Sequence, residues 1–248
     1  ALRNLDWRTE ISFFEKTVRM SPQSALAHYH LSEACLRHNR LPEALLAAGR
    51  AAALRPRYAG AHHMLGQTYS AMRRPEEAIQ EYQRAARYSL ESGNFYDAAR
   101  SLGNMSIEYA ARGELEEAMR ACRQALTLDS EFAAGRNNLG YLLLLAGQWD
   151  EAERELRVAL RQNPTLAEAH SNLGLLYARR GELDRAAGEL AEAVRLGAGN
   201  AETYARLGVV ALLREDRARA DEFFRQALRL DPENQRARAG LVRLRSPQ

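Results

Sequence analysis

The sequence has little lysine, cysteine or proline and no long apolar run. Lys16 is the one lysine, so arginine carries nearly all of the positive charge. The two cysteines, Cys35 and Cys122, show no metal-ligand spacing and give no disulfide framework. No apolar run approaches the length of about 20 residues that crosses a bilayer. The sequence begins at Ala1 without a signal peptide, and we expect it to be a piece of a larger protein.

The charge pattern favours solvated helix faces over a nucleic-acid site. The net charge is only +3 although the pI is about 9.0. Arginine and glutamate alternate at helical spacing, as in the segment 179–195. Nucleic-acid binding would need arginines gathered on one face with aromatic residues between them. Few arginines fall on the positions that we assign below to a groove, the main ones being Arg37, Arg100, Arg179 and Arg206.

A period of 34 residues organises the chain. It divides the sequence into six units: 25–58, 59–92, 99–132, 133–166, 167–200 and 201–234. A fixed period of this length is typical of a solenoid, in which each unit buries its apolar face against its neighbours. Residues 1–24 then form an N-terminal helix or partial repeat, 93–98 is an insertion, and 235–248 holds a C-terminal capping helix and tail.

Small residues recur in register and predict two closely crossing helices in each unit. The twentieth and twenty-seventh residues are always alanine, and the eighth is always glycine or serine. Methyl groups and glycines allow helices to approach closely. Gly113, Gly147 and Gly181 are expected to end first helices in a left-handed cap.

With this pattern in six units, the chain resembles the tetratricopeptide repeat family. The resemblance implies an all-α fold: a right-handed superhelical solenoid of stacked antiparallel helix pairs, with six full repeats, an N-terminal helix and a C-terminal capping helix. It also implies that the first helices line a concave groove. In addition, Arg3, Asn4, Trp7, Ser21 and Pro22 resemble the junction that precedes the C-terminal repeat tail of polytopic membrane glycosyltransferase-like proteins.

We find no catalytic constellation, and predict no enzyme activity, cofactor or metal in this chain. A glycine-rich phosphate loop, a paired-histidine zinc motif and a Cys-x-x-Cys motif are all missing. His28, His62 and His170 occupy the fourth position of their units. Equivalent positions of stacked helices lie roughly 10 Å apart, too far for one ion. We therefore assign these histidines to packing.

The predicted groove carries polar and apolar residues. Positions 2, 5, 6, 9, 12 and 13 of each unit are expected to face it. Asn104, Asn138 and Asn172 follow one another at position six, and we call them the asparagine ladder. An amide both donates and accepts, so a ladder can hold an extended peptide backbone; alternatively these side chains are simply hydrated. The remaining candidate groove residues are Tyr29, Arg37, His63, Gln67, Tyr141, Leu144, Leu145, Leu175, Arg179, Arg206, Val209 and Leu213.

Two functions remain in view. The first is a protein–protein interaction scaffold that binds a peptide or a partner helix in the groove. The second is a soluble regulatory or acceptor-recruiting domain of a membrane glycosyltransferase, tethered to a membrane domain in the parent protein. The second would place the chain outside the cytoplasm, the first inside it. Nucleic-acid binding is less favoured than either.

Overall fold

The computed structural model describes residues 3–245, with side chains from Glu10 to Leu244. The side chains of Arg3, Asn4 and Trp7 lie outside this described part. Within it, all regular structure is helical, and no helix is long and apolar enough to span a membrane. The chain divides into two compact units, Ala1–Gly135 (unit 1) and Arg136–Gln248 (unit 2). The boundary between the two units falls inside a helix that spans Ala133–Leu145.

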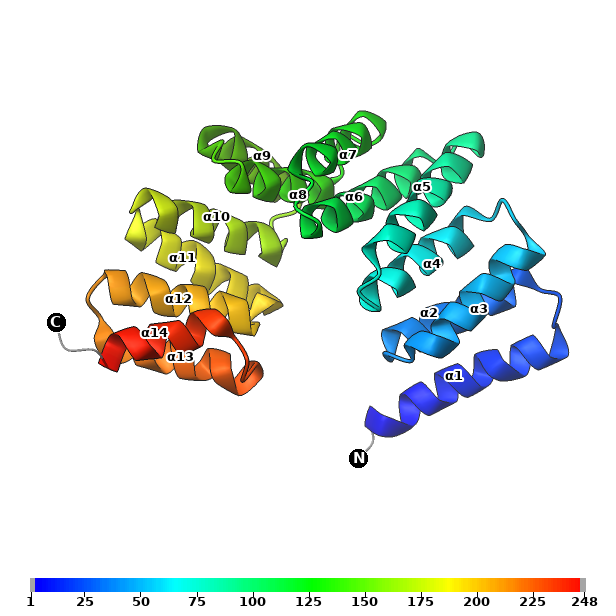
Figure 1. Cartoon of the computed structure of the whole chain (residues 1–248), viewed down its shortest axis with the longest axis horizontal. Helices are drawn as coiled ribbons and strands as arrows, with labels where there is room; N and C mark the ends of the chain where they lie inside the picture. The colour runs from blue at the N-terminus through cyan, green and yellow to red at the C-terminus, as the bar shows by residue number, and fades with distance from the viewer. Residues whose placement is uncertain (1–2, 246–248) are drawn as a thin grey trace. The chain divides into compact units, whose positions relative to one another are not determined.

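Unit 1 is built from consecutive antiparallel helices, coloured blue to green in Figure 1. A single helix comes first and packs on the next one, and three pairs then follow. Their bounds are α1 (Arg3–Met20), α2 (Ala25–Arg37), α3 (Leu41–Leu54), α4 (Ala59–Ala71), α5 (Pro75–Glu91), α6 (Phe95–Ala111) and α7 (Leu115–Leu128).

Unit 2 continues the pattern and ends in a single helix, α14, that packs on α12 and α13. The bounds are α8 (Ala133–Leu145), α9 (Trp149–Gln162), α10 (Ala167–Arg180), α11 (Leu183–Ala193), a π-helical turn η1 (Val194–Ala198), α12 (Ala201–Leu213), α13 (Arg217–Leu230) and α14 (Gln235–Arg245). In α14, Ala237 is buried, and Leu241 and Leu244 pack on the cluster around Phe224.

The predicted close crossing of the two helices in each repeat is confirmed. All twelve alanines at positions 20 and 27 have no exposed surface. At position eight, a Cβ on Gly140 would lie 2.6 Å from Leu156, and one on Gly174 would lie 2.6 Å from Leu190. The helices are therefore so close that an added methyl group would force the opposing side chain to move.

The turn between the two helices places position 15 in the left-handed region in every repeat. Three repeats use the predicted glycines, Gly113, Gly147 and Gly181, with φ of 79°, 78° and 79°. The other three use Asn39, Arg73 and Glu215, with φ of 58°, 57° and 63°. The turn geometry is thus common to all repeats, although arginine and glutamate tolerate it less well than glycine does.

A pair of side chains at positions 4 and 23 joins the two helices of a repeat. In three repeats a basic side chain at position 4 meets a glutamate at position 23: His62 Nδ1 lies 2.6 Å from Glu81, Arg136 Nη1 lies 2.9 Å from Glu155, and His170 Nδ1 lies 2.7 Å from Glu189. The third repeat has Leu102 and Ala121 in one apolar cluster, and the last stacks Tyr204 against Phe223 with ring centroids 6.5 Å apart. The histidines therefore have packing roles.

The segment 93–98, predicted as an insertion, covers the turn after α5 and the start of α6, and these two helices have 17 residues each, against 13 or 14 for most others. Asn94 caps α6, because its side chain accepts a hydrogen bond from the Asp97 amide at 3.1 Å. Phe95 and Tyr96 are 54% and 59% exposed at the start of α6. The insertion therefore extends one helix hairpin without interrupting the order of the pairs.

Candidate functional site

The candidate site lies on the accessible face of the first helices of the repeats, which we call the first-helix surface. Each unit has its own such surface, formed by one face of α2, α4 and α6 in unit 1 and by one face of α8, α10 and α12 in unit 2. Side chains at positions 9 and 13 are at least partly exposed in every repeat, whereas those at position five are buried in five repeats of six. The predicted stripe is therefore narrower than the sequence pattern indicated.

In unit 2 the first-helix surface carries an apolar strip. Tyr141, Leu175 and Val209 occupy position nine of three successive repeats and are partly exposed. Leu145 and Leu213 at position 13 are 40% and 48% exposed, and the exposed Arg179 stands at that position in the repeat between them. Leu144, predicted to belong to this strip, is fully buried instead. It lies one residue, about 100° around the helix, from Leu145, and that rotation turns it into the core with Leu142 and Leu143.

Polar side chains at position six of unit 2 bind the preceding repeat. Asn172 Nδ2 donates to Asn137 Oδ1 at 2.9 Å. Arg206 Nη1 donates to Ser171 Oγ at 3.0 Å, and its Nε lies 3.1 Å from Glu202. Asn137 and Ser171 both occupy position five, one repeat earlier. We call these hydrogen bonds from position six to the preceding position five the inter-repeat bonds.

Unit 1 contains the same kind of bond between Asn104 and His63. Asn104 Nδ2 lies 3.5 Å from His63 Nε2, and His63 Nδ1 lies 2.9 Å from Ser101 Oγ. Ser101 Oγ donates to the Asp97 carbonyl, so it accepts from His63 Nδ1, which leaves Nε2 to accept from Asn104. Burial lowers the pKa of His63 to about 3, and Arg100 acts in the same direction. His63 is therefore neutral and buried, which corrects its predicted place on the accessible groove.

The inter-repeat bonds decide which atoms of the ladder can meet a ligand. The Asn172 amide nitrogen is occupied by Asn137, whereas its Oδ1 has no partner among the described residues. Asn104 likewise uses its amide nitrogen, which lies 3.5 Å from His63 Nε2. Asn138 Oδ1 accepts from Asn137 Nδ2 at 3.4 Å. At Asn104 and Asn172, then, the ladder presents acceptor oxygens rather than a donor and an acceptor together.

The other candidate residues differ in accessibility. Tyr29 is partly buried against Tyr58, with ring centroids 5.5 Å apart, and burial raises its pKa. Arg37 is exposed and pairs with Glu10 and Glu33, while Gln67 is partly exposed on α4. Arg179 is exposed and has no ion-pair partner in the part of the chain that the structure describes.

Sequence reasoning missed Asn137 and Ser171 as partners of position six. The signal in the sequence is a polar residue at position five directly before a polar residue at position six. The sequence pattern assigns both positions to the groove. Because the two positions lie about 100° apart on a helix, one faces the neighbouring repeat when the other faces the groove.

A hydroxyl and an imidazole lie within hydrogen-bonding distance in unit 1, but they do not form an open catalytic pair. Ser101 and His63 come closest to a nucleophile and base. Both are buried, however, and the Ser101 hydroxyl proton is directed at the Asp97 carbonyl at 2.9 Å. A nucleophile must pass its proton to the base, and here the base donates to the hydroxyl instead. Within residues 3–245 no group of His, Cys, Asp or Glu is placed to hold a metal ion.

Comparisons with known families match most of the chain. Three models, each described as tetratricopeptide repeat, match residues 12–62, residues 59–91 together with 201–234, and residues 109–176.

The chain is also similar to part of two curated proteins. It is 29% identical over 153 residues to Protein O-mannosyl-transferase Tmtc3 of Drosophila melanogaster, and 26% identical over 151 residues to Protein O-mannosyl-transferase TMTC3 of Homo sapiens. Each match covers 57% of this chain but only 16% of the relative. The chain thus spans about a sixth of their length.

Solved structures with the same fold share little sequence with it. The Cut9 and Hcn1 hetero-tetramer of the APC/C aligns with a TM-score of 0.83 and 17% identity, over 97% of this chain and 46% of that chain. PilF of Pseudomonas aeruginosa aligns with a TM-score of 0.69 and 22% identity, over 88% and 97%. YrrB, a TPR protein with an unusual peptide-binding site, aligns with a TM-score of 0.54 and 20% identity, over 82% and 97%.

Proposed function

Because the chain belongs to the tetratricopeptide repeat family, we propose that it is a protein-interaction module that binds a segment of a partner protein on the first-helix surface of unit 2. The single observation that carries this proposal is the apolar row at position nine, Tyr141, Leu175 and Val209, flanked by the exposed Leu145 and Leu213 and beside the acceptor oxygen of Asn172. Exposed apolar side chains next to fixed polar atoms suit a peptide ligand.

The polarity of the ladder indicates how the ligand is held. The Asn172 Oδ1 accepts hydrogen bonds, while its amide nitrogen is already bound to Asn137. A partner segment must then offer unpaired N–H groups, as the backbone of an extended peptide does and that of a helix interior does not. An extended segment that places apolar side chains against Leu175 and Val209 fits this surface better than a helix.

The test uses extended peptides selected from a display library on the wild-type chain, with binding measured by fluorescence anisotropy. Leu145→Asp with Leu213→Asp should weaken binding at least tenfold, because a carboxylate would be desolvated against the apolar ligand. Leu46→Asp is the matched control, since Leu46 is 76% exposed on α3, away from the first helices. Equal binding by the double variant, with unchanged helicity, would refute the proposed surface.

The acceptor role of Asn172 has its own test. Asn172→Ala should weaken binding by roughly twofold to tenfold, the range for one hydrogen bond. Methylating the peptide amide that meets Asn172 should cost the same factor, and combining both changes should cost little more. Fully additive losses would show that the two groups do not meet.

The arginines of unit 2 favour a peptide over a nucleic acid. Arg206 is held by Glu202 and Ser171, which leaves Arg179 as the exposed arginine at the predicted groove positions of this unit. One guanidinium does not form a basic track along a phosphate backbone. Binding of single-stranded oligonucleotides that falls steeply with salt would contradict this assignment.

A second candidate rests on the similarity to the O-mannosyl-transferases. We propose that the chain is the repeat domain of a larger membrane glycosyltransferase, where it recruits protein acceptors or a regulatory partner. The similarity over 57% of the chain supports it. The parent reading frame provides the test: an upstream polytopic segment is expected, and a reading frame that starts near Ala1 would refute it.

A further inference from the structure

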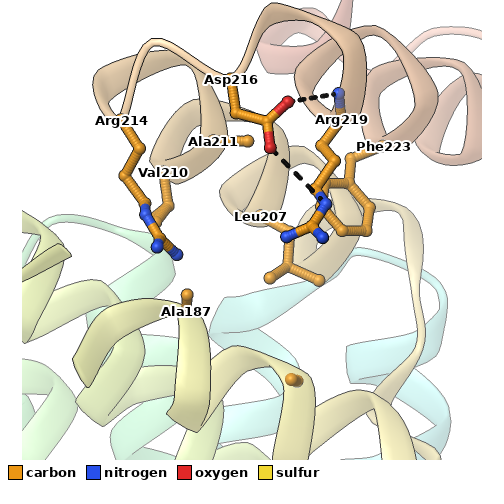
Figure 2. A pocket seen from close by; sticks show the side chains of 9 residues that line it. Ala187, Leu207, Val210, Ala211, Arg214, Asp216, Arg219 and Phe223 are labelled. Atoms are coloured by element: carbon orange, nitrogen blue, oxygen red, sulfur yellow. Dashed lines mark hydrogen bonds and ion pairs between the residues drawn. The ribbon is translucent and has the colours of Figure 1, made fainter. Parts of the chain in front are cut away.

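Unit 2 contains a cavity of about 340 Å³ between α11, α12 and α13, on a side of α12 that the first-helix surface does not use. Its wall is mainly apolar, and the charged side chains that line it are Arg214, Arg219 and Asp216, of which Asp216 pairs with Arg219. Figure 2 shows Arg214 on one side, directed toward Ala187, and Arg219 on the other, beside Leu207 and Phe223. Such a cavity is at the small end of ligand sites, which range over about 300–1,000 Å³.

The same place one repeat earlier is occupied by the side chain of Tyr177. Its ring is 2% exposed, and its hydroxyl donates to Glu153 Oε1 at 2.9 Å. The guanidinium carbon of Arg185 lies 3.8 Å from the ring centroid, which is a cation–π contact. The hollow that remains beside Tyr177 is lined by Arg157, Arg185 and other residues.

At the next junction the ring, the carboxylate and one of the three arginines are missing, because Arg157, which donates to the Tyr177 hydroxyl at 3.2 Å, is replaced by Ala191. With an offset of 34 residues, Tyr177 becomes Ala211 and Glu153 becomes Ala187. Arg185 and Arg180 correspond to Arg219 and Arg214, and the aspartates at 150 and 184 correspond as well. Three alanines that line the cavity, Ala187, Ala191 and Ala211, therefore replace the three groups that fill this place one repeat earlier, while two arginines are kept.

The arginines at the cavity have fewer partners than their counterparts. Arg180 binds both Asp150 and Glu153, and its side chain is 18% exposed. Arg214 pairs with Asp184 at 2.9 Å and is 43% exposed. Arg219 has an ion pair with Asp216 at 3.5 Å, but it has no ring at 211 to stack on.

We propose that this cavity binds a segment of a partner protein in which a carboxylate lies next to an aromatic side chain. The ring takes the place that Tyr177 fills one repeat earlier, with Arg219 over its face. The carboxylate takes the place of Glu153 and binds Arg214. Phe223, which stands where the preceding repeat has Glu189, makes the wall more apolar and favours a ring over a polar group. This site does not depend on the proposed function of the first-helix surface.

The first test titrates small probes into the ¹⁵N-labelled full chain. N-acetyl-L-tyrosine contains both the ring and the carboxylate, N-acetyl-L-tyrosinamide only the ring, and N-acetylglycine only the carboxylate. We expect N-acetyltyrosine to shift the amide signals of Ala187, Ala211 and Phe223, and the tyrosinamide to bind about threefold to fivefold more weakly, as one exposed ion pair allows. N-acetylglycine should cause no shift. Equal binding of acid and amide, or shifts confined to the first-helix surface, would overturn the proposal.

Variants locate the binding within the cavity. Arg219→Gln should weaken binding of both tyrosine probes, whereas Arg225→Gln should not. Arg225 is the matched control, because it lies on the same helix, is 58% exposed and pairs with Asp221. If Arg225→Gln weakens binding as much as Arg219→Gln, the assignment is wrong.

Rebuilding the filled state of the preceding repeat gives a readout that does not depend on a ligand. Ala211→Tyr with Ala187→Glu should place a ring and a carboxylate in the cavity. This double variant should unfold at a higher temperature than the wild type and should no longer bind N-acetyltyrosine. A lower unfolding temperature, or retained binding, would show that the two places are not equivalent and would overturn the proposal.

Discussion

The ion pair between His62 and Glu81 allows a sharp test of how one repeat is held together. Both side chains are nearly buried, at 9% and 10% exposure, with 2.6 Å between His62 Nδ1 and Glu81 Oε2. The other ring nitrogen lies 2.9 Å from the Pro56 carbonyl. Because both neighbours of the ring accept hydrogen bonds, this arrangement needs a proton on each nitrogen or one on the carboxyl group.

Removing one partner should cost far more than removing both. Breaking a buried ion pair costs about 3–5 kcal/mol, and we expect Glu81→Ala to cost about 3 kcal/mol. Glu81 also pairs with Arg84, whose side chain is 51% exposed and stays hydrated in the variant. The double variant His62→Leu with Glu81→Ala copies the apolar pair of the third repeat, Leu102 and Ala121. Since an apolar replacement of a buried pair is often neutral, it should cost less than about 1 kcal/mol.

The assay is urea unfolding followed by circular dichroism, together with amide hydrogen exchange in α4 and α5. Exchange is needed because repeat proteins open locally. A loss of 3 kcal/mol corresponds to roughly 100-fold faster exchange where opening is local. Glu189→Ala is the control, because Glu189 is 28% exposed, and it should cost about 1 kcal/mol or less. A double variant as unstable as Glu81→Ala would refute the reasoning.

Three further predictions concern packing, turns and pH. Gly174→Ala should destabilise the chain by about 1–3 kcal/mol because its Cβ would meet Leu190. Gly188→Ala on α11 should stabilise the chain by up to about 1 kcal/mol, because the space around Gly188 is open and alanine favours the helix. Thermal unfolding of both variants measures the difference. Glu215→Gly should raise the unfolding temperature, since φ is 63° there and a left-handed residue with a Cβ costs about 1–2 kcal/mol; a lower value would contradict the strain. The hydrogen bond from His38 lowers the pKa of Glu10 below 4.5. The stability lost in Glu10→Gln should therefore be present above about pH 5 and vanish as the pH falls through the lowered pKa, as urea unfolding at several pH values would show.

Much of the fold could be predicted from the sequence because its determinants repeat. The alanines at positions 20 and 27 are all buried, and the glycines at position 15 all have positive φ. Each of these constraints depends on one small residue in one local geometry, so it can be read from the spacing. Asn39, Arg73 and Glu215 adopt the same turn without glycine, which the pattern alone did not indicate.

The accessible face was harder to predict, for a geometrical reason. The spacing of residues in a helix predicts the direction of each side chain to within about one residue, or 100°. It does not show which of these side chains the neighbouring helix buries. His63 is therefore buried, as position five is in five repeats of six, and Leu144 is buried although position 12 is partly exposed in the other five repeats. The cavity near Ala211 was missed because it arises from the absence of a large side chain, which only a comparison of repeats reveals.

The two kinds of contact in this chain differ in what happens when repeats are duplicated, deleted or exchanged during evolution. The pair at positions 4 and 23 lies inside a repeat, so a copied repeat carries His170 and Glu189 together wherever it is inserted. The inter-repeat bond lies across a junction, so Asn172 keeps its partner only when the repeat before it supplies Asn137. Two repeats of equal stability would then not be interchangeable. The order of the repeats along the chain is partly determined by the residues at their junctions.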